Sequence, residues 1–71
     1  MVRIYLIAGK YVAVRNSSMI AGPLKSLADI RLVATRMLRD GETLVRHESV
    51  PVELWDASTV NEVNLNSAWG V

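Results

Sequence analysis

The chain has 71 residues, of which eight are basic and seven acidic, and its net charge is +1. This length suits one domain, so residues 1–71 are expected to form a single one. The lack of cysteine excludes disulfides and thiolate metal sites, and His47 is the sole histidine, so no metal or other cofactor is expected. The hydrophobic share of 51% is typical of ordered proteins.

No apolar run approaches the roughly 20 residues of a membrane span. With no export signal, the cytoplasm is the expected location.

The chain opens with two β-prone runs that are separated by Gly9-Lys10. Glycine at the first central position suits a type II′ two-residue turn. We therefore predict an antiparallel hairpin over residues 2–16, in which Ala8 pairs with Tyr11.

Both faces of this hairpin are apolar in the middle, whereas a half-exposed hairpin should alternate between apolar and polar side chains. A single helix can cover only one face of such a ribbon. The second face therefore needs another cover, and we predict that it forms a dimer interface through Tyr5, Ile7, Val12 and Val14.

A helix is predicted next, over residues 24–39 or from residue 27 to residue 39, after turn signals around residues 16–18 and 21–23. Pro23 is acceptable at a first helical position, and Ser26 with Asp29 three residues later resembles a capping box. Gly41 supplies the stop. The helix is amphipathic, and its broad apolar face is predicted to pack on the sheet through Leu27, Ile30, Val33, Ala34, Met37 and Leu38.

The opposite face of this helix is polar and basic. Lys25 lies four residues before Asp29, and Arg36 lies four residues before Asp40, which predicts ordinary salt bridges on a solvated surface. Leu32 lies among these polar residues, either as an ordinary exposed apolar side chain or as part of a contact surface.

Two further antiparallel strands are predicted over residues 43–48 and 50–55, with Pro51 confining the latter to an edge or a bulge. The predicted fold class is thus α+β. The tail, residues 56–71, is ambiguous. Thr59 with Glu62 has the form of a capping box and favours a helix, while the alternation over residues 63–66 favours a strand.

No catalytic centre is predicted. His47 and Ser49 would share one face of a strand and approach each other, but no strained glycine elbow accompanies them. The carboxylates lie in turns, strand ends and the tail, and a chain this short has little room for a deep pocket. We therefore expect a protein that is not an enzyme.

Two surfaces are candidates for binding. Leu32, Arg36 and Arg39 on the helix are one candidate contact with a protein partner, and Trp69 near the chain end is another, since tryptophan is enriched at interfaces. Alternatively, Arg36 and Arg39 act with the arginines of the hairpin in contacting nucleic-acid phosphates.

The order of hairpin, turn, helix and strand, with Ser26-Leu27-Ala28-Asp29 opening the helix and residues 41–45 reading Gly-Glu-Thr-Leu-Val, resembles small phage-encoded ββαβ accessory proteins. These include anti-CRISPR proteins and inhibitors of host RNA polymerase. The resemblance implies a non-enzymatic phage inhibitor that occludes a host protein complex. The resulting hypothesis is a protein-binding module that forms a homodimer, and the alternative is a small nucleic-acid-binding regulator.

Overall fold

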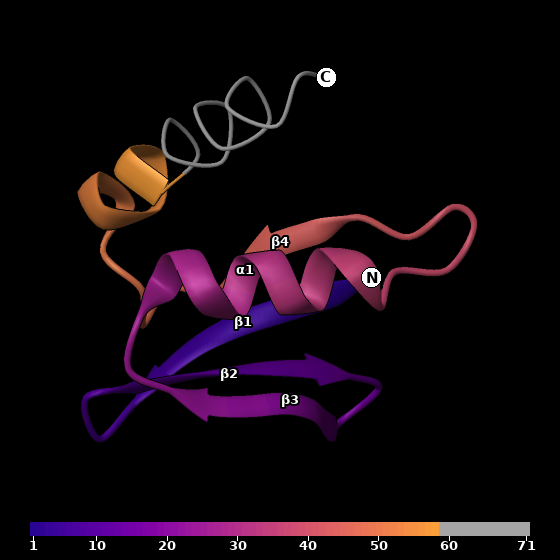
Figure 1. Cartoon of the computed structure of the whole chain (residues 1–71), viewed down its shortest axis with the longest axis horizontal. Helices are drawn as coiled ribbons and strands as arrows, with labels where there is room; N and C mark the ends of the chain where they lie inside the picture. Colours follow the sequence, from indigo (N-terminus) through magenta and orange to yellow (C-terminus); the bar gives the residue numbers. More distant parts are fainter. Residues whose placement is uncertain (59–71) are drawn as a thin grey trace.

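The structure is a computed structural model that describes residues 1–58. It has an α+β fold, as predicted, with a four-stranded sheet in the order β3-β2-β1-β4 and α1 lying across it (Figure 1). The elements are β1 (Val2–Ile7), β2 (Lys10–Arg15), β3 (Ser18–Leu24), α1 (Leu27–Arg36) and β4 (Leu44–Arg46). A second helix begins at Val52 and is described as far as Ser58. Neither helix of the described chain is long and apolar enough to cross a membrane.

The hairpin of β1 and β2 forms with a different turn from the one predicted. Ala8 and Gly9 occupy the turn, with φ values of 51° and 78°, and positive φ at both central positions is typical of a type I′ turn. Ile4 consequently pairs with Ala13, not with Arg15. This difference shifts the partner by two residues, so every side chain keeps its predicted face.

A second tight turn carries the chain into β3. Asn16 and Ser17 have φ values of 49° and 66°, and β3 then pairs antiparallel with β2 as far as Leu24. The predicted turn at residues 21–23 lies inside this strand, where the register shifts and the bond between Gly22 and Pro23 is cis. Pro23 is therefore a strand residue and not the first residue of a helix.

Helix α1 begins at Leu27, the later of the two predicted starts, and ends earlier than predicted. Ser26 is the N-cap, and its hydroxyl accepts a hydrogen bond from the Asp29 backbone N–H at 3.3 Å, which confirms the capping signal. The helix ends at Arg36, three residues before the predicted end. The N–H groups of Met37 and Leu38 bond three residues back, at 3.0 and 3.3 Å, which tightens the last turn.

The segment after α1 differs from the prediction in two ways. β4 pairs parallel with β1, with Val2 opposite Leu44, so the sheet is mixed and not wholly antiparallel. The predicted strand over residues 50–55 is instead the start of the second helix, in which the Trp55 N–H bonds to the Pro51 carbonyl at 3.1 Å. Pro51 stands just before this helix, where its missing N–H costs no hydrogen bond.

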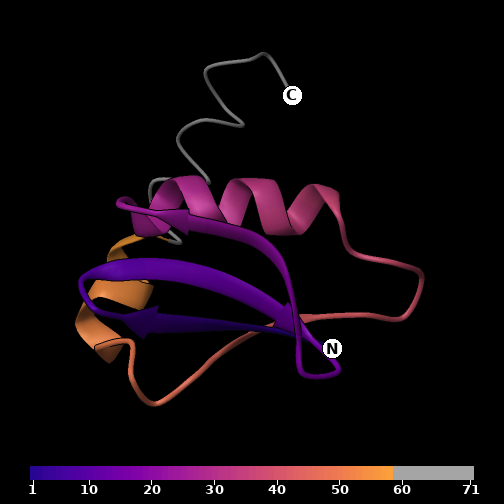
Figure 2. The same ribbon diagram turned by 90° about the horizontal axis from the view of Figure 1, so that it is seen from below.

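The core lies between α1 and one face of the sheet (Figure 2). On α1 the buried side chains include Arg31, while Val33 and Met37, which were expected in the core, are 37% and 39% exposed. The apolar face is therefore narrower than predicted and turned toward Arg31. The buried core cluster is Val2, Ile4, Tyr11, Ala13, Leu27, Ile30, Ala34 and Val50.

Candidate functional site

The side of the sheet away from α1 carries no described helix (Figure 2). Strand pairing places alternate residues of β1 and β2 on this side, together with Met19 of β3, which lies opposite Val14. Ile7 and Met19 are 58% and 57% exposed. We call this side the open face, and its residues in β1, β2 and β3 are Arg3, Tyr5, Ile7, Lys10, Val12, Val14 and Met19.

The structure brings together all of the residues predicted for a dimer interface. Tyr5 and Val14 are half-buried and Ile7 is exposed, so these side chains are accessible to a partner. Val12 is only 8% exposed and adds little accessible surface. The apolar second face of the hairpin is thus present, and within residues 1–58 no helix packs over it.

One end of the open face is hollowed. The cavity is shallow and has a volume of about 360 Å³, and it is lined by side chains from the N-terminus, the first two strands and the turn after β2. We call it the Arg3 hollow. Its lining residues are Met1, Arg3, Tyr5, Val14, Asn16 and Ser17. Nothing in the sequence indicates this site, because Asn16 and Ser17 fit an ordinary turn.

Arg3 is the cation of this hollow. Its side chain is exposed, and the hydrogen bond that its Nη2 donates goes to the Met1 thioether at 3.4 Å, which is a weak acceptor. No carboxylate in the described part of the chain forms an ion pair with it. The guanidinium therefore retains most of its capacity to bind an acidic group.

Arg15, the other hairpin arginine, is bound by a carboxylate and by a backbone carbonyl. Its Nε and Nη2 donate to the two carboxylate oxygens of Glu42 at 2.9 and 2.6 Å, and Nη2 also donates to the Met37 carbonyl at 2.7 Å. This bidentate pair joins the end of β2 to the loop after α1. Arg15 is therefore not available for the nucleic-acid contact that was considered for it.

Glu42 also binds two groups besides Arg15. Its Oε1 accepts the Arg39 N–H at 2.8 Å, and its Oε2 lies 3.5 Å from the amino group of Met1. The hydrogen bond from Arg15, followed by the one from Arg39, lowers the pKa of Glu42 to about 2. The carboxylate next to the Arg3 hollow is thus already neutralised by the groups around it.

A stacked pair of aromatic rings also lies at the open face. The rings of Tyr5 and His47 lie 4.1 Å apart between centroids, at an angle of 27°. Ser49 holds this pair in place, because its Oγ lies 2.8 Å from His47 Nδ1 and accepts the Leu6 N–H at 3.0 Å. The contact predicted between His47 and Ser49 is therefore present.

The hydrogen bonds of this cluster fasten the loop after β4 to β1. The Ser49 N–H also donates to His47 Nδ1, at 3.1 Å, which makes Nδ1 an acceptor and assigns the ring proton to Nε2. The Ser49 hydroxyl thus bridges His47 Nδ1 and the Leu6 N–H. Because the His47 ring stacks on Tyr5, this bridge orients the Tyr5 ring on the open face.

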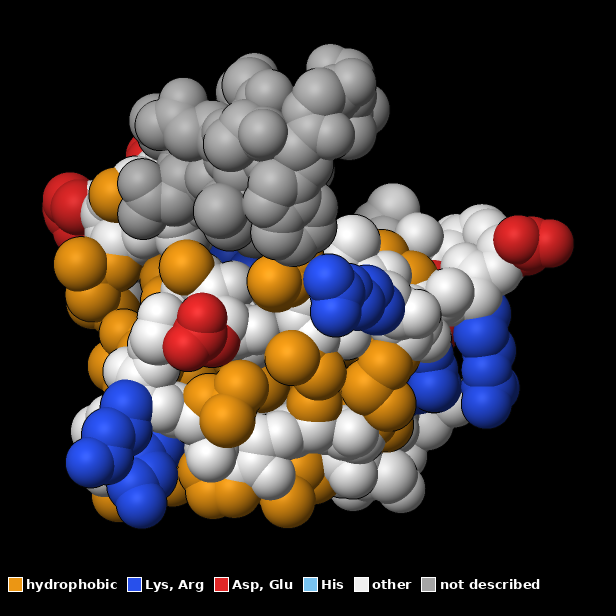
Figure 3. Space-filling view, viewed as in Figure 1, with side chains coloured by type: hydrophobic (Ala, Val, Ile, Leu, Met, Phe, Trp, Pro, Cys, Tyr) orange, Lys and Arg blue, Asp and Glu red, His pale blue; other side chains and the backbone are white. Residues whose placement is uncertain are grey.

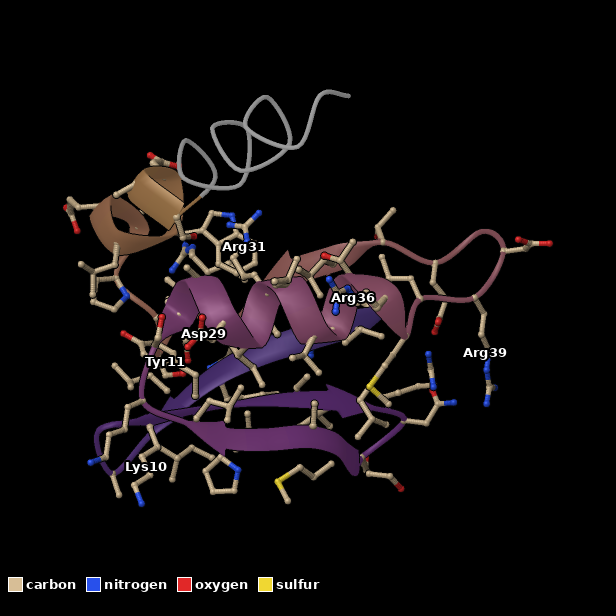
Figure 4. All side chains as sticks on the ribbon, viewed as in Figure 1. Lys10, Tyr11, Asp29, Arg31, Arg36 and Arg39 are labelled. Atoms are coloured by element: carbon tan, nitrogen blue, oxygen red, sulfur yellow. The ribbon has the colours of Figure 1, made fainter. Side chains whose placement is uncertain are left out.

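The basic residues of the helix side are spread out. Arg36 projects from α1 and Arg39 from the loop after it, while Lys10 lies at the far end of the sheet (Figure 4). The basic side chains on this side lie around a band of hydrophobic ones, without forming one patch (Figure 3). Leu32 is half-buried, and Trp69 lies outside the described residues.

The salt bridges predicted along α1 are absent. Within residues 1–58, the ion pairs join Glu42 to Arg15 and to the amino terminus, and neither Lys25 with Asp29 nor Arg36 with Asp40 forms one. The prediction from i,i+4 spacing was therefore wrong at both pairs. Such exposed pairs contribute little free energy even where they form.

Arg31 is a structural residue that the sequence analysis missed. It is 7% exposed, and its guanidinium carbon lies 3.7 Å from the centre of the Trp55 ring. Its Nη1 donates to the Trp55 carbonyl and to Ser58 Oγ, each at 3.1 Å. These contacts join the second helix to α1, on the side of the sheet opposite the open face.

Comparisons with protein families, curated proteins and solved structures give no match to this chain. The features of this chain that indicate a function are the exposed apolar side chains of the open face and the charge of Arg3.

Proposed function

We propose that this chain is a non-enzymatic protein-binding module whose interface is the open face of the sheet. The observation that supports the proposal is the exposure of Ile7 and Met19, 58% and 57%, on a face that no described helix covers. Ile7 lies toward one end of this face and Met19 toward the other, with the half-buried Tyr5 and Val14 between them. Exposed apolar side chains spread over one face of a small protein mark an interaction site. Tyrosine, methionine and arginine, which are enriched in interfaces, all occur on this face.

The size of the face indicates how tight such a contact is. Strands of six, six, seven and three residues, at about 3.3 Å per residue and about 4.8 Å apart, give a face of about 350 Å². A standard interface buries about 800 Å² per partner. The face by itself therefore supports a transient contact, and a tighter complex requires the partner to reach beyond it.

A second copy of this chain is a weaker candidate occupant than a different protein. Stable homodimers bury about 2,000 Å² or more in total, which exceeds what two such faces supply. The homodimer stays a prediction, and we propose a heterologous protein as the principal partner.

The mode of action that we propose is occlusion of a surface on the partner. The resemblance of the architecture to small phage-encoded inhibitors, including anti-CRISPR proteins, supports a role against a host protein complex in the host cytoplasm. The alternative, a nucleic-acid-binding regulator, has Arg36 and Arg39 on the helix side, and it predicts binding that weakens steeply with salt.

Selection from a library of displayed protein fragments tests the proposal. Clones that bind the immobilised wild-type chain are then tested on Met19→Asp and on Val33→Asp, which places the same charge on the exposed side of α1. We expect the Met19 substitution to weaken binding at least tenfold and the Val33 substitution to leave it unchanged. The absence of binding clones, or clones indifferent to Met19→Asp, contradicts the proposal.

Sedimentation of the wild-type chain at micromolar concentration addresses the homodimer in the same material. A monomer that still binds the selected fragments supports a heterologous partner. A stable dimer that dissociates on Met19→Asp instead assigns the open face to a second copy.

A further inference from the structure

Within residues 1–58, the polar side chains of the Arg3 hollow make few hydrogen bonds. The Tyr5 hydroxyl and the side chains of Asn16 and Ser17 make no hydrogen bond to any residue in the described range, and Arg3 has the Met1 thioether alone. All of these groups can donate a hydrogen bond. An open apolar face therefore ends in a hollow where unpaired donors and one positive charge come together.

We infer that the Arg3 hollow receives an acidic side chain of the bound protein, while apolar side chains on either side of that residue pack against Val14 and Met19. The inference rests on the proposed function and specifies the chemistry of the partner. Guanidinium groups bind carboxylates through two parallel hydrogen bonds. The Asn16 amide and the Ser17 and Tyr5 hydroxyls supply further donors around the same point.

Charge complementarity favours a carboxylate over other occupants. No acidic side chain lines the hollow, and the nearby Glu42 is bound by Arg15 and lies 3.5 Å from the amino group of Met1. The surrounding apolar side chains of Met1 and Val14 reduce the local screening by water, which strengthens a contact between opposite charges.

A nucleic acid fits this face less well. Binding along a phosphate backbone depends on several cations that each neutralise a phosphate. On the described residues of the open side, Arg3 is the cation of the hollow, and Lys10 lies at the opposite end of β2 from Asn16 and Ser17. One arginine within an apolar surface is better matched to one carboxylate between apolar side chains.

Two blocked tripeptides test the inference, acetyl-Leu-Glu-Leu-amide and the matched acetyl-Leu-Gln-Leu-amide, titrated into the full chain with the backbone amides followed by NMR. For a ligand this small we expect a dissociation constant on the order of 1 mM. The Glu peptide should shift the amides of Asn16 and Ser17, and the Gln peptide should bind about fivefold more weakly.

The protein variants are Arg3→Gln and, as a matched exposed arginine, Arg39→Gln. Arg3→Gln should remove the preference for the Glu peptide, and Arg39→Gln should retain it. Equal binding of the two peptides overturns the inference, even if Arg3→Gln does not fold, because that comparison uses the wild-type chain alone.

Separate outcomes distinguish this inference from the proposed function. Equal binding of both peptides at the open face contradicts the inferred specificity for a carboxylate but remains consistent with the proposed protein-binding function. Another outcome contradicts both the inference and the proposed function. In it, an eight-nucleotide oligo-dT binds to the wild-type chain and not to Arg3→Gln, and neither peptide nor any displayed fragment binds. The inference is supported if the Glu peptide binds more tightly than the Gln peptide and inorganic phosphate at the same concentration does not displace it.

Discussion

Gly22 provides the sharpest test of how β3 is packed. Its φ is +97°, and a Cβ at this position would lie 2.6 Å from the Tyr11 carbonyl oxygen and 3.3 Å from Ile30 Cδ1. Gly22→Ala therefore combines an unfavourable backbone conformation with a steric clash in the core. Gly9 is a matched control, because its φ is +78° and nothing lies within 4 Å of a Cβ built on it.

The free energies of unfolding should separate these two contributions. An alanine at positive φ costs about 1 kcal/mol, which is the whole effect expected at Gly9. The clash at Gly22 adds about 1–3 kcal/mol, as in other overpacked sites. Since a chain of this size has a total stability of about 4–10 kcal/mol, Gly22→Ala should lower the urea midpoint severely.

Urea unfolding of both variants, followed by circular dichroism at neutral pH, measures the difference. We expect Gly22→Ala to be less stable than Gly9→Ala by about 1–3 kcal/mol. Equal losses in the two variants would refute the reasoning, because β3 could then move away from the Tyr11 carbonyl at no cost.

Other predictions follow from the hydrogen bonds. Because the fold lowers the pKa of Glu42 to about 2, its carboxylate stabilises the protein above the ordinary pKa of 4.5 and loses this effect as the pH falls from about 4.5 to about 2. Glu42→Gln should remove that part of the acid sensitivity, measured as urea midpoints between pH 2 and pH 6; an unchanged pH profile would contradict it. Ser26→Ala should lower the free energy of unfolding by about 1 kcal/mol through loss of the N-cap, and an unchanged urea midpoint would speak against this cap. Ser49→Ala leaves the Leu6 N–H without its acceptor at 3.0 Å, so we expect a loss of about 1–2 kcal/mol and faster hydrogen exchange at that amide. Unchanged exchange would show that Ser49 does not fasten the loop.

The faces of the hairpin could be predicted from the sequence, whereas its turn could not. Alternation assigns Tyr5 and Val14 to one side and Ile4 and Ala13 to the other, and a slip of two residues in the partner strand preserves that assignment. The turn depended on whether Gly9 takes the first or the second central position. Ala8 accepts a φ of 51°, an uncommon conformation for alanine that residue preferences do not favour.

The second helix shows where local patterns fail. The apolar residues over positions 50–55 fit a short strand as well as the first turns of a helix, and periodicity cannot separate the two at this length. The deciding contact is the stacking of Trp55 on Arg31, which lies 24 residues away in sequence. No local pattern signals a buried arginine on α1, so both the helix and the rotation of the α1 core face escaped prediction.

The Arg3 hollow also depends on long-range placement. It forms because the turn after β2 brings Asn16 and Ser17 beside Arg3 and the N-terminus. The sequence predicted the apolar face but not its polar end. Spacing along the chain could not have shown that these residues meet.

α1 packs on one side of the sheet and the second helix lies beside the strands (Figure 2), so neither of these described helices covers the open face. α1 buries Ile30 against Ile4 and Ala13, and Trp55 joins the same core through Arg31. The exposed apolar side chains of the described helices, Val33, Val52 and Leu54, lie on helices that do not cover the open face. The Tyr5 ring there is already held by His47, so binding does not have to order it. A small, preorganised face with Arg3 near one end and Lys10 at the other should therefore select its partners by charge placement more than by area.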